Sequence, residues 1–115
     1  MADMNLFVES RDSGAWTVVE PKGEIDLYTA PKLKDQLIAL VERGRERLVV
    51  NLDGVEFLDS TGLGVLIGGL KRCREREGEL ALAAPRETVQ KVLRITGLDK
   101  VFAVHGSVDE ATSGS

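Results

Sequence analysis

The run from Leu48 to Leu52 places the tightest limit on the fold. It reads Leu-Val-Val-Asn-Leu, is rich in β-branched residues and is too short for a typical helix. A strand with almost no polar face has to be covered on both sides, which is typical of a central strand in a parallel sheet. The run therefore predicts an α/β protein in which helices pack against the sheet.

Helical patterns follow on either side of this strand. A first helix is predicted from Thr29 or Ala30, because Pro31 suits the first helical position, and Gly44 is expected to end it. A second helix is predicted after Asp59-Ser60, and a third after Pro85. Their apolar residues repeat at three and four positions, which lines one face of each helix. Those of the first helix are Leu33, Leu37, Leu40 and Val41.

Short β-prone runs supply the remaining strands. Residues 6–8 and 15–19 predict an opening hairpin around the turn-rich residues 11–14, with Pro21 at a sheet edge or an irregularity and Gly23–Asp26 leaving the strand. Further strands are expected at 80–83 and 100–105, with Gly97 capping the third helix and one weak helix from Val108. The aromatic residues expected in the core are Phe7, Trp16, Phe57 and Phe102.

The order of these elements defines the expected fold class. It is ββαβαβαβ, which predicts an α/β fold with a mixed sheet of four to five strands and three to four helices, whose later strands are parallel. The 115 residues suit a single domain, 1–115, with a tail that is expected to be disordered from about residue 112.

Charge and composition narrow the classes of partner. The formal net charge of -4 disfavours binding to nucleic acid. No run of about 18 apolar residues or signal peptide is visible, so we expect a cytoplasmic protein that does not enter a membrane. Cys73 is the only cysteine, which excludes an internal disulfide and any cysteine-cluster metal site.

The segment Asp59-Ser60-Thr61-Gly62-Leu63-Gly64 resembles the STAS-domain anti-sigma factor antagonists. In that family Asp-Ser-(Ser/Thr)-Gly-(Leu/Ile)-Gly opens the second helix, and the serine after the aspartate receives a phosphate. Gly23-Glu24-Ile25-Asp26 resembles the family's Gly-Glu-(Leu/Ile)-Asp loop, and Thr96-Gly97-Leu98 resembles its (Ser/Thr)-Gly-Leu turn. The resemblance extends from about Leu6 to Ala111 and implies a STAS-like domain.

The resemblance also implies a function. The unphosphorylated protein is expected to bind an anti-sigma factor that is an ATP-dependent serine kinase, and so to release a sigma factor. Ser60 is the implied phosphate acceptor, and a serine phosphatase is implied to remove the phosphate. ATP and magnesium would belong to the kinase, so we expect no catalysis, cofactor or metal in this chain. The residues implied to contact the partner are Gly23, Glu24, Ile25, Asp26, Asp59, Thr61, Gly62, Leu63 and Gly64.

The chemistry of Ser60 is compatible with this switch. A serine is a good N-cap, and the amino end of a helix favours negative charge, so a phosphate close to Asp59 and Asp26 would be tolerated by the fold. Taken alone, the pair Asp59-Ser60 is more often only a helix cap. Gly62 and Gly64 are poor helix residues, and either close approach of a partner backbone or tight packing within the monomer would explain them.

Other classes of function fit the sequence less well. Ser60 is not in Gly-x-Ser-x-Gly, and His105 is the only histidine, so a serine triad is disfavoured. Asp59–Gly62 differs by one inserted residue from the Asp-(Ser/Thr)-Gly motif of aspartic proteases. Gly62 and Gly64, with Gly68, form at most a degraded dinucleotide fingerprint, and there is no Gly-Lys-(Ser/Thr) loop. The main alternative is a STAS module that scaffolds another signalling complex or senses a ligand.

Overall fold

The predicted central strand is present and is buried on both faces. In the computed structural model, which describes residues 6–113, it is β3 (Arg47–Asn51). The side chains of Leu48, Val49 and Val50 are all 0% exposed. Leu48 and Val50 belong to one apolar cluster and Val49 to a second, because successive side chains in a strand point to opposite faces. The side chains of β3 therefore contribute to two apolar clusters, one on each side of the strand.

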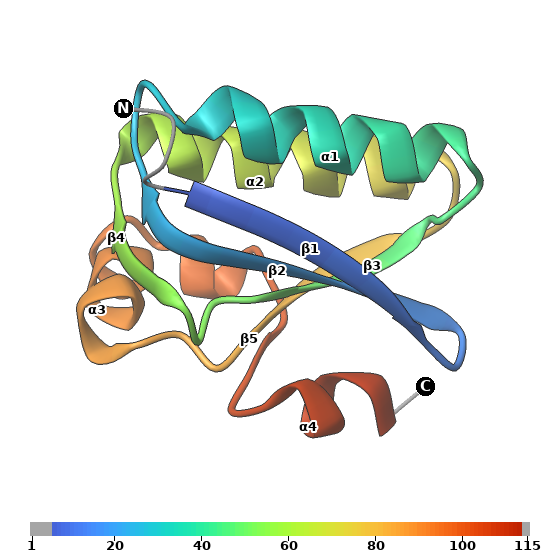
Figure 1. The fold of residues 1–115 in the computed structure, drawn as a ribbon. Coiled ribbons are helices and arrows are strands. Elements are labelled where there is room, and N and C mark those ends of the chain that lie inside the picture. Colours follow the sequence, from blue (N-terminus) through green and yellow to red (C-terminus); the bar gives the residue numbers. More distant parts are fainter. Residues whose placement is uncertain (1–5, 114–115) are drawn as a thin grey trace.

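The described residues form a mixed six-stranded sheet (Figure 1). Four strands lie in the order β1-β2-β3-β5, followed by the short β6, while β4 also pairs with β2. The β1–β2 pair is antiparallel, and every other pair is parallel. The remaining strands are β1 (Leu6–Ser13), β2 (Trp16–Ile25), β4 (Val55–Leu58), β5 (Glu79–Ala83) and β6 (Val104–His105). The mixed α/β fold class is confirmed.

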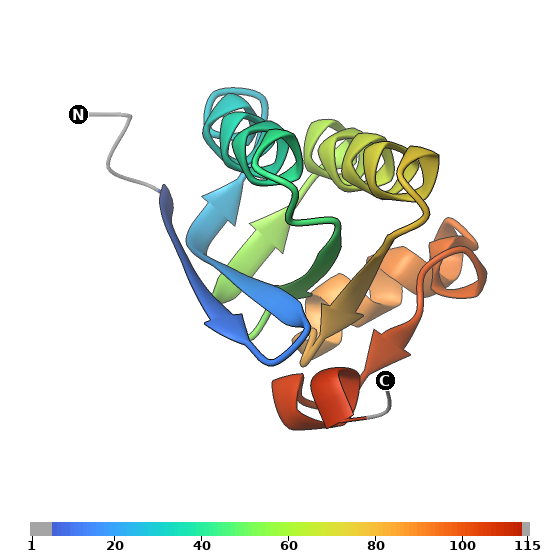
Figure 2. The same cartoon turned by 90° about the vertical axis from the view of Figure 1, so that its right-hand side faces the viewer.

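Helices cover both faces of this sheet. The helices are α1 (Ala30–Glu42), α2 (Ser60–Glu75), α3 (Glu87–Ile95) and α4 (Val108–Ser113), with a 3-10 turn, η2 (Leu98–Lys100). Figure 2 shows α1 and α2 side by side over one face, with α3 and α4 on the opposite side. The larger core lies under α1 and α2, and its apolar residues include Leu33, Leu37, Leu66 and Leu70.

β4 was not predicted. It follows β3 after a short turn at Asp53-Gly54, and both strands run parallel to β2 on the same side. Between Val19 and Gly23, β2 changes its partner from β3 to β4, and Pro21, which has no amide hydrogen, lies in this gap. The predicted irregularity at Pro21 is therefore confirmed, whereas the expectation that Gly23–Asp26 leaves the strand is wrong, because β2 continues to Ile25.

Other expectations also need correction. Trp16 and Phe102 are buried as predicted, but Phe7 and Phe57 are 54% and 50% exposed. The last strand is only Val104–His105, because η2 occupies part of the expected run. Thr112 and Ser113, near the position where a disordered tail was expected to begin, belong to α4, and residues 114–115 lie outside the described range. The predicted positive φ is present at both helix-ending glycines, Gly44 and Gly97.

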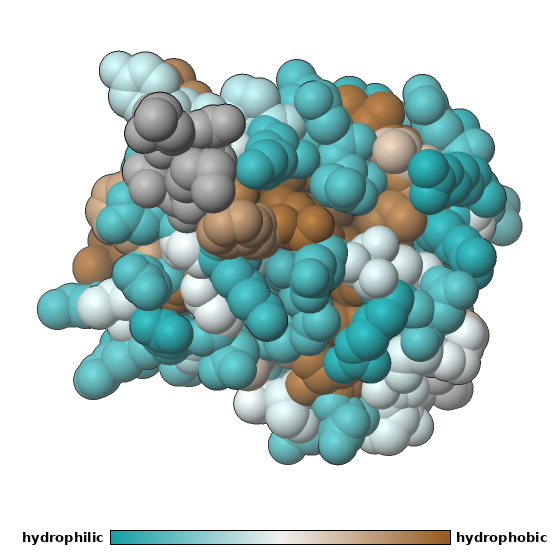
Figure 3. All heavy atoms as spheres, in the orientation of Figure 1, coloured by the Kyte–Doolittle hydropathy of each residue, from teal (hydrophilic) through white to brown (hydrophobic). Residues whose placement is uncertain are grey.

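The outer surface in the view of Figure 3 is mostly hydrophilic. Apolar atoms are visible there as narrow strips between polar side chains, one of them below α1, and not as one broad patch. The face seen in this view therefore offers no broad apolar docking surface.

Candidate phosphorylation and docking site

Two predicted segments meet at the carboxyl ends of β2 and β4. Across these parallel strands, Glu24 is paired with Phe57 and Ile25 with Leu58. The amide of Asp59 donates a hydrogen bond to the carbonyl oxygen of Ile25 at 3.1 Å. The Gly23–Asp26 segment and the start of α2 are therefore neighbours, although Asp59 lies 33 positions after Asp26 in the chain. In the crevice outside the carboxyl ends of parallel strands, α/β proteins commonly bind their ligands.

Asp59, and not Ser60, is the N-cap of α2. Its backbone is extended, with φ -99° and ψ -174°, and its Oδ1 accepts a hydrogen bond from the Gly62 amide at 3.0 Å. Ser60 is the first residue of the helix. The expectation that Ser60 caps the helix is thus wrong, because the chain leaves β4 in an extended conformation at Asp59 and turns into the helix only afterwards.

This correction leaves the Ser60 hydroxyl available for chemistry. The residue is exposed, and no hydrogen bond among residues 6–113 uses its side chain. In the first turn of a helix, amide hydrogens lack intrahelical acceptors and the helix dipole favours negative charge. The structure therefore presents a reachable hydroxyl at a position where an added anion is electrostatically favourable.

The turn before α1 is held by Asp26. Its Oδ1 accepts hydrogen bonds from the amides of Tyr28 at 2.9 Å and Thr29 at 3.0 Å. The hydrogen bond from the Thr29 amide is the main reason why the pKa of Asp26 lies below its usual value, so this carboxylate stays ionised. The Thr29 hydroxyl also accepts from the Asp26 amide at 2.9 Å and donates to the Glu24 carbonyl at 2.7 Å. Asp26 therefore shapes the turn as well as contributing charge.

The remaining residues of the predicted partner set divide by burial. Glu24 and Gly64 are exposed, and Gly23, Asp26, Asp59 and Thr61 are partly exposed. Ile25 is 0% exposed and Leu63 is 7% exposed, so their side chains support the loops from inside. A Cβ added at the buried Gly62 would lie 2.4 Å from Leu58 Cδ1 and 2.7 Å from Ile25 Cγ2. Packing within the monomer therefore accounts for Gly62.

Three exposed apolar side chains near this site were missed by the sequence analysis. Leu27 is 62% and Tyr28 is 81% exposed in the turn between Asp26 and Thr29, and the half-exposed Phe57 is paired with Glu24. Exposed aromatic residues are often the main contributors to protein–protein affinity. The sequence signal for two of these side chains was the apolar pair Leu27-Tyr28, which lies between the polar residues Asp26 and Thr29.

The other reactive residues lie elsewhere. His105 lies on β6, which pairs with β5. Ser60 follows β4, which pairs with β2, so the two residues belong to parts of the sheet that are not adjacent. Burial raises the pKa of Cys73 to about 11, so its thiol stays protonated at neutral pH. Among residues 6–113 there is no group of three or more His, Cys, Asp or Glu side chains placed to hold a metal ion. No helix within that range is long and apolar enough to cross a bilayer.

Comparisons with known proteins concern the family and the fold of the chain. The family model described as "STAS domain" matches residues 8–111. An anti-sigma-B factor antagonist of Staphylococcus aureus is 33% identical over 102 residues, which cover 89% of this chain and 94% of the relative.

Solved structures show the same fold. An anti-sigma factor antagonist from Mycobacterium paratuberculosis superposes with a TM-score of 0.87 at 31% identity, covering 95% of this chain and 92% of that one. The Bacillus cell fate determinant SpoIIAA in its phosphorylated form has a TM-score of 0.73 at 21% identity, covering 95% and 97%. At this lower identity the second similarity concerns the fold alone.

Proposed function

The chain belongs to the STAS domain family, and from that membership we propose that it is an anti-sigma factor antagonist controlled by phosphorylation of Ser60. In its unphosphorylated form it binds an anti-sigma factor that is also a serine kinase, and this binding releases a sigma factor. Phosphate on Ser60 ends the binding, and a serine phosphatase restores it. ATP and magnesium belong to the kinase.

The exposed position of Ser60 in the first turn of α2 is the observation that carries this proposal. A kinase can reach its hydroxyl without unfolding the helix. The relative SpoIIAA, which has the same fold, exists in a phosphorylated form. The exposed side chains of Leu27, Tyr28 and Phe57 supply apolar contact area at the same end of the sheet. A partner that docks there would place its active site over Ser60.

Phosphorylation changes docking far more than folding. A phosphate adds about -1.5 to -2 charges at neutral pH. Within the monomer, the helix end offsets part of this charge by about 0.3 to 1 kcal/mol. In a complex, the same charge would be buried beside Asp59 and near Asp26, and burying unpaired charge costs several kcal/mol. About 4 kcal/mol corresponds to a roughly thousandfold loss of affinity.

Two substitutions at Ser60 test the switch. Binding to the anti-sigma factor kinase of the same organism is measured by calorimetry, with and without ATP. We expect Ser60→Ala to bind tightly in both conditions, because it cannot receive phosphate, and Ser60→Asp to bind at least about tenfold more weakly. Mass spectrometry should show one phosphate on the wild type and none on Ser60→Ala.

The control is Ser10→Asp, which introduces the same charge on an exposed residue of β1. It should bind like the wild type. All variants should show the same thermal unfolding within a few degrees. If Ser60→Ala and Ser60→Asp both bind as the wild type does, the switch is not at Ser60.

A further inference from the structure

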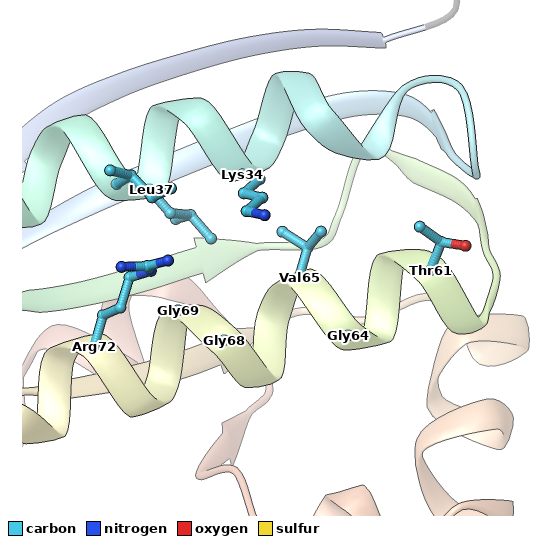
Figure 4. A pocket seen from close by; sticks show the side chains of 9 residues that line it. Lys34, Leu37, Thr61, Gly64, Val65, Gly68, Gly69 and Arg72 are labelled. Atoms are coloured by element: carbon cyan, nitrogen blue, oxygen red, sulfur yellow. The ribbon is translucent and has the colours of Figure 1, made fainter.

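A groove of about 270 Å³ lies between α1 and α2, beside the phosphorylation site. In Figure 4, Lys34 and Leu37 project from α1 toward α2, and Thr61, Val65 and Arg72 project from α2 toward α1. The groove also reaches the partly buried Ile38. It extends from Thr61 to Arg72 along α2, a distance of roughly 16 Å at 1.5 Å per residue.

The groove remains open because α2 lacks side chains at Gly64 and Gly68. A Cβ added at either glycine would meet nothing within 4 Å. Glycine in a helix is less favourable than alanine by about 0.5 to 1 kcal/mol, and packing within the described residues does not require these two glycines. At Gly69, by contrast, a Cβ would lie 2.9 Å from Leu80 Cδ1 and 3.0 Å from Leu37 Cδ1.

The lining of the groove is apolar and cationic. Leu37, Ile38 and Val65 supply its apolar walls, and Lys34 and Arg72 are its only charged lining residues. Neither cation forms an ion pair with another residue in the range 6–113. Glu42 and Glu75 border Arg72 outside the groove. A cationic groove in a chain with a net charge of -4 favours an anionic occupant by charge complementarity.

The size of the groove distinguishes between classes of occupant. It has room for about nine water molecules at roughly 30 Å³ each. A helix is about 10 Å wide with its side chains and would not enter such a space. Pockets for drug-sized ligands begin at about 300 Å³ and combine apolar walls with a few polar groups that set orientation. At about 270 Å³ the groove is slightly smaller than that class and suits a small ligand.

We infer that the α1–α2 groove binds a small amphipathic anion, with an aromatic or short alkyl body between Ile38 and Val65 and its anionic group paired with Lys34 or Arg72. The ligand lies over Gly64 and Gly68, where added side chains would exclude it. One end of the groove is Thr61, directly after Ser60. A bound anion therefore changes the surface on which a kinase docks, a regulatory consequence that rests on the proposed function.

The site itself can be tested without the kinase. The probe is 8-anilinonaphthalene-1-sulfonate, an aromatic anion whose fluorescence rises in apolar surroundings. We expect saturable binding to the folded protein, with amide NMR shifts concentrated at Thr61, Gly64 and Gly68. Gly68→Leu, which fills the groove, should weaken binding about tenfold or more. Lys34→Gln with Arg72→Gln should weaken it several-fold and reduce its salt dependence.

Two controls match these changes. Gln90→Leu adds the same side chain at an exposed position of α3, and Lys71→Gln removes a charge from α2 outside the groove. Both should bind the probe like the wild type.

Absence of saturable binding, or binding that the groove variants leave unchanged, would overturn the inference. Groove variants that weaken only kinase binding would assign the groove to the protein interface instead. Failure of the Ser60 switch would leave the probe result unaffected.

Discussion

The two faces of α2 use the same residue type for opposite reasons. On the inner face, Gly62 and Gly69 are buried, and side-chain atoms lie within 3.0 Å of where a Cβ would be placed. On the outer face, Gly64 and Gly68 have no such neighbours. Glycine is thus needed for packing on one face, whereas on the other it costs stability and leaves the surface open. Packing within the described residues does not account for this cost, and for that reason we propose that the outer face binds a ligand or partner.

Gly62→Ala is the strongest test of the inner face. The added methyl group would overlap Leu58 and Ile25 and approach the Ile25 carbonyl oxygen at 3.2 Å. Overpacking of this kind typically costs about 1 to 3 kcal/mol. We expect the free energy of unfolding, measured by urea denaturation, to fall by that amount. An unchanged midpoint would show that Leu58 and Ile25 can move aside and that Gly62 is not required for packing.

Asp59→Ala tests the junction between β4 and the helix. The substitution removes the carboxylate that accepts the Gly62 amide hydrogen bond at 3.0 Å. Loss of an N-cap costs about 0.5 to 2 kcal/mol, and Asp59→Asn should recover most of it because asparagine caps equally well. Thermal unfolding of the three proteins measures the difference. If Asp59→Asn were as unstable as Asp59→Ala, charge and not capping would be the contribution of Asp59.

Gly64→Ala should have the smallest effect, and of the opposite sign. Nothing lies within 4 Å of the added methyl group, so the helix preference should stabilise the fold by about 0.5 to 1 kcal/mol. If the outer face is the docking surface, the same substitution should weaken kinase binding. The free energy of unfolding, measured by urea denaturation, should therefore rise, while the affinity for the kinase, measured by calorimetry, should fall. If the variant is more stable and binds the kinase as well as the wild type does, Gly64 does not contribute to the partner surface.

The sequence was sufficient wherever local pattern and chain order decide the structure. The Leu33 to Val41 periodicity predicted α1, Pro31 marked its start, and the buried run at Leu48–Leu52 predicted the central strand. It was not sufficient where two local options have similar energy. Asp59 and Ser60 are both good caps, and the extended exit from β4 decided between them. Phe7 and Phe57 are exposed because the sheet presents those positions to the outside.

The amino-acid sequence by itself determined the α/β class, the order of the helices and of every strand except β4, and the position of Ser60 at the start of α2. Periodicity, β-branched runs and capping residues act over a few neighbouring positions, so they can be read along the chain. Only the tertiary structure decided that Leu27, Tyr28 and Phe57 lie exposed at the same end of the sheet as Ser60, and that Gly64 and Gly68 border an open groove. These features depend on which distant segments pack together, and the energy of that packing is not contained in any single stretch of sequence.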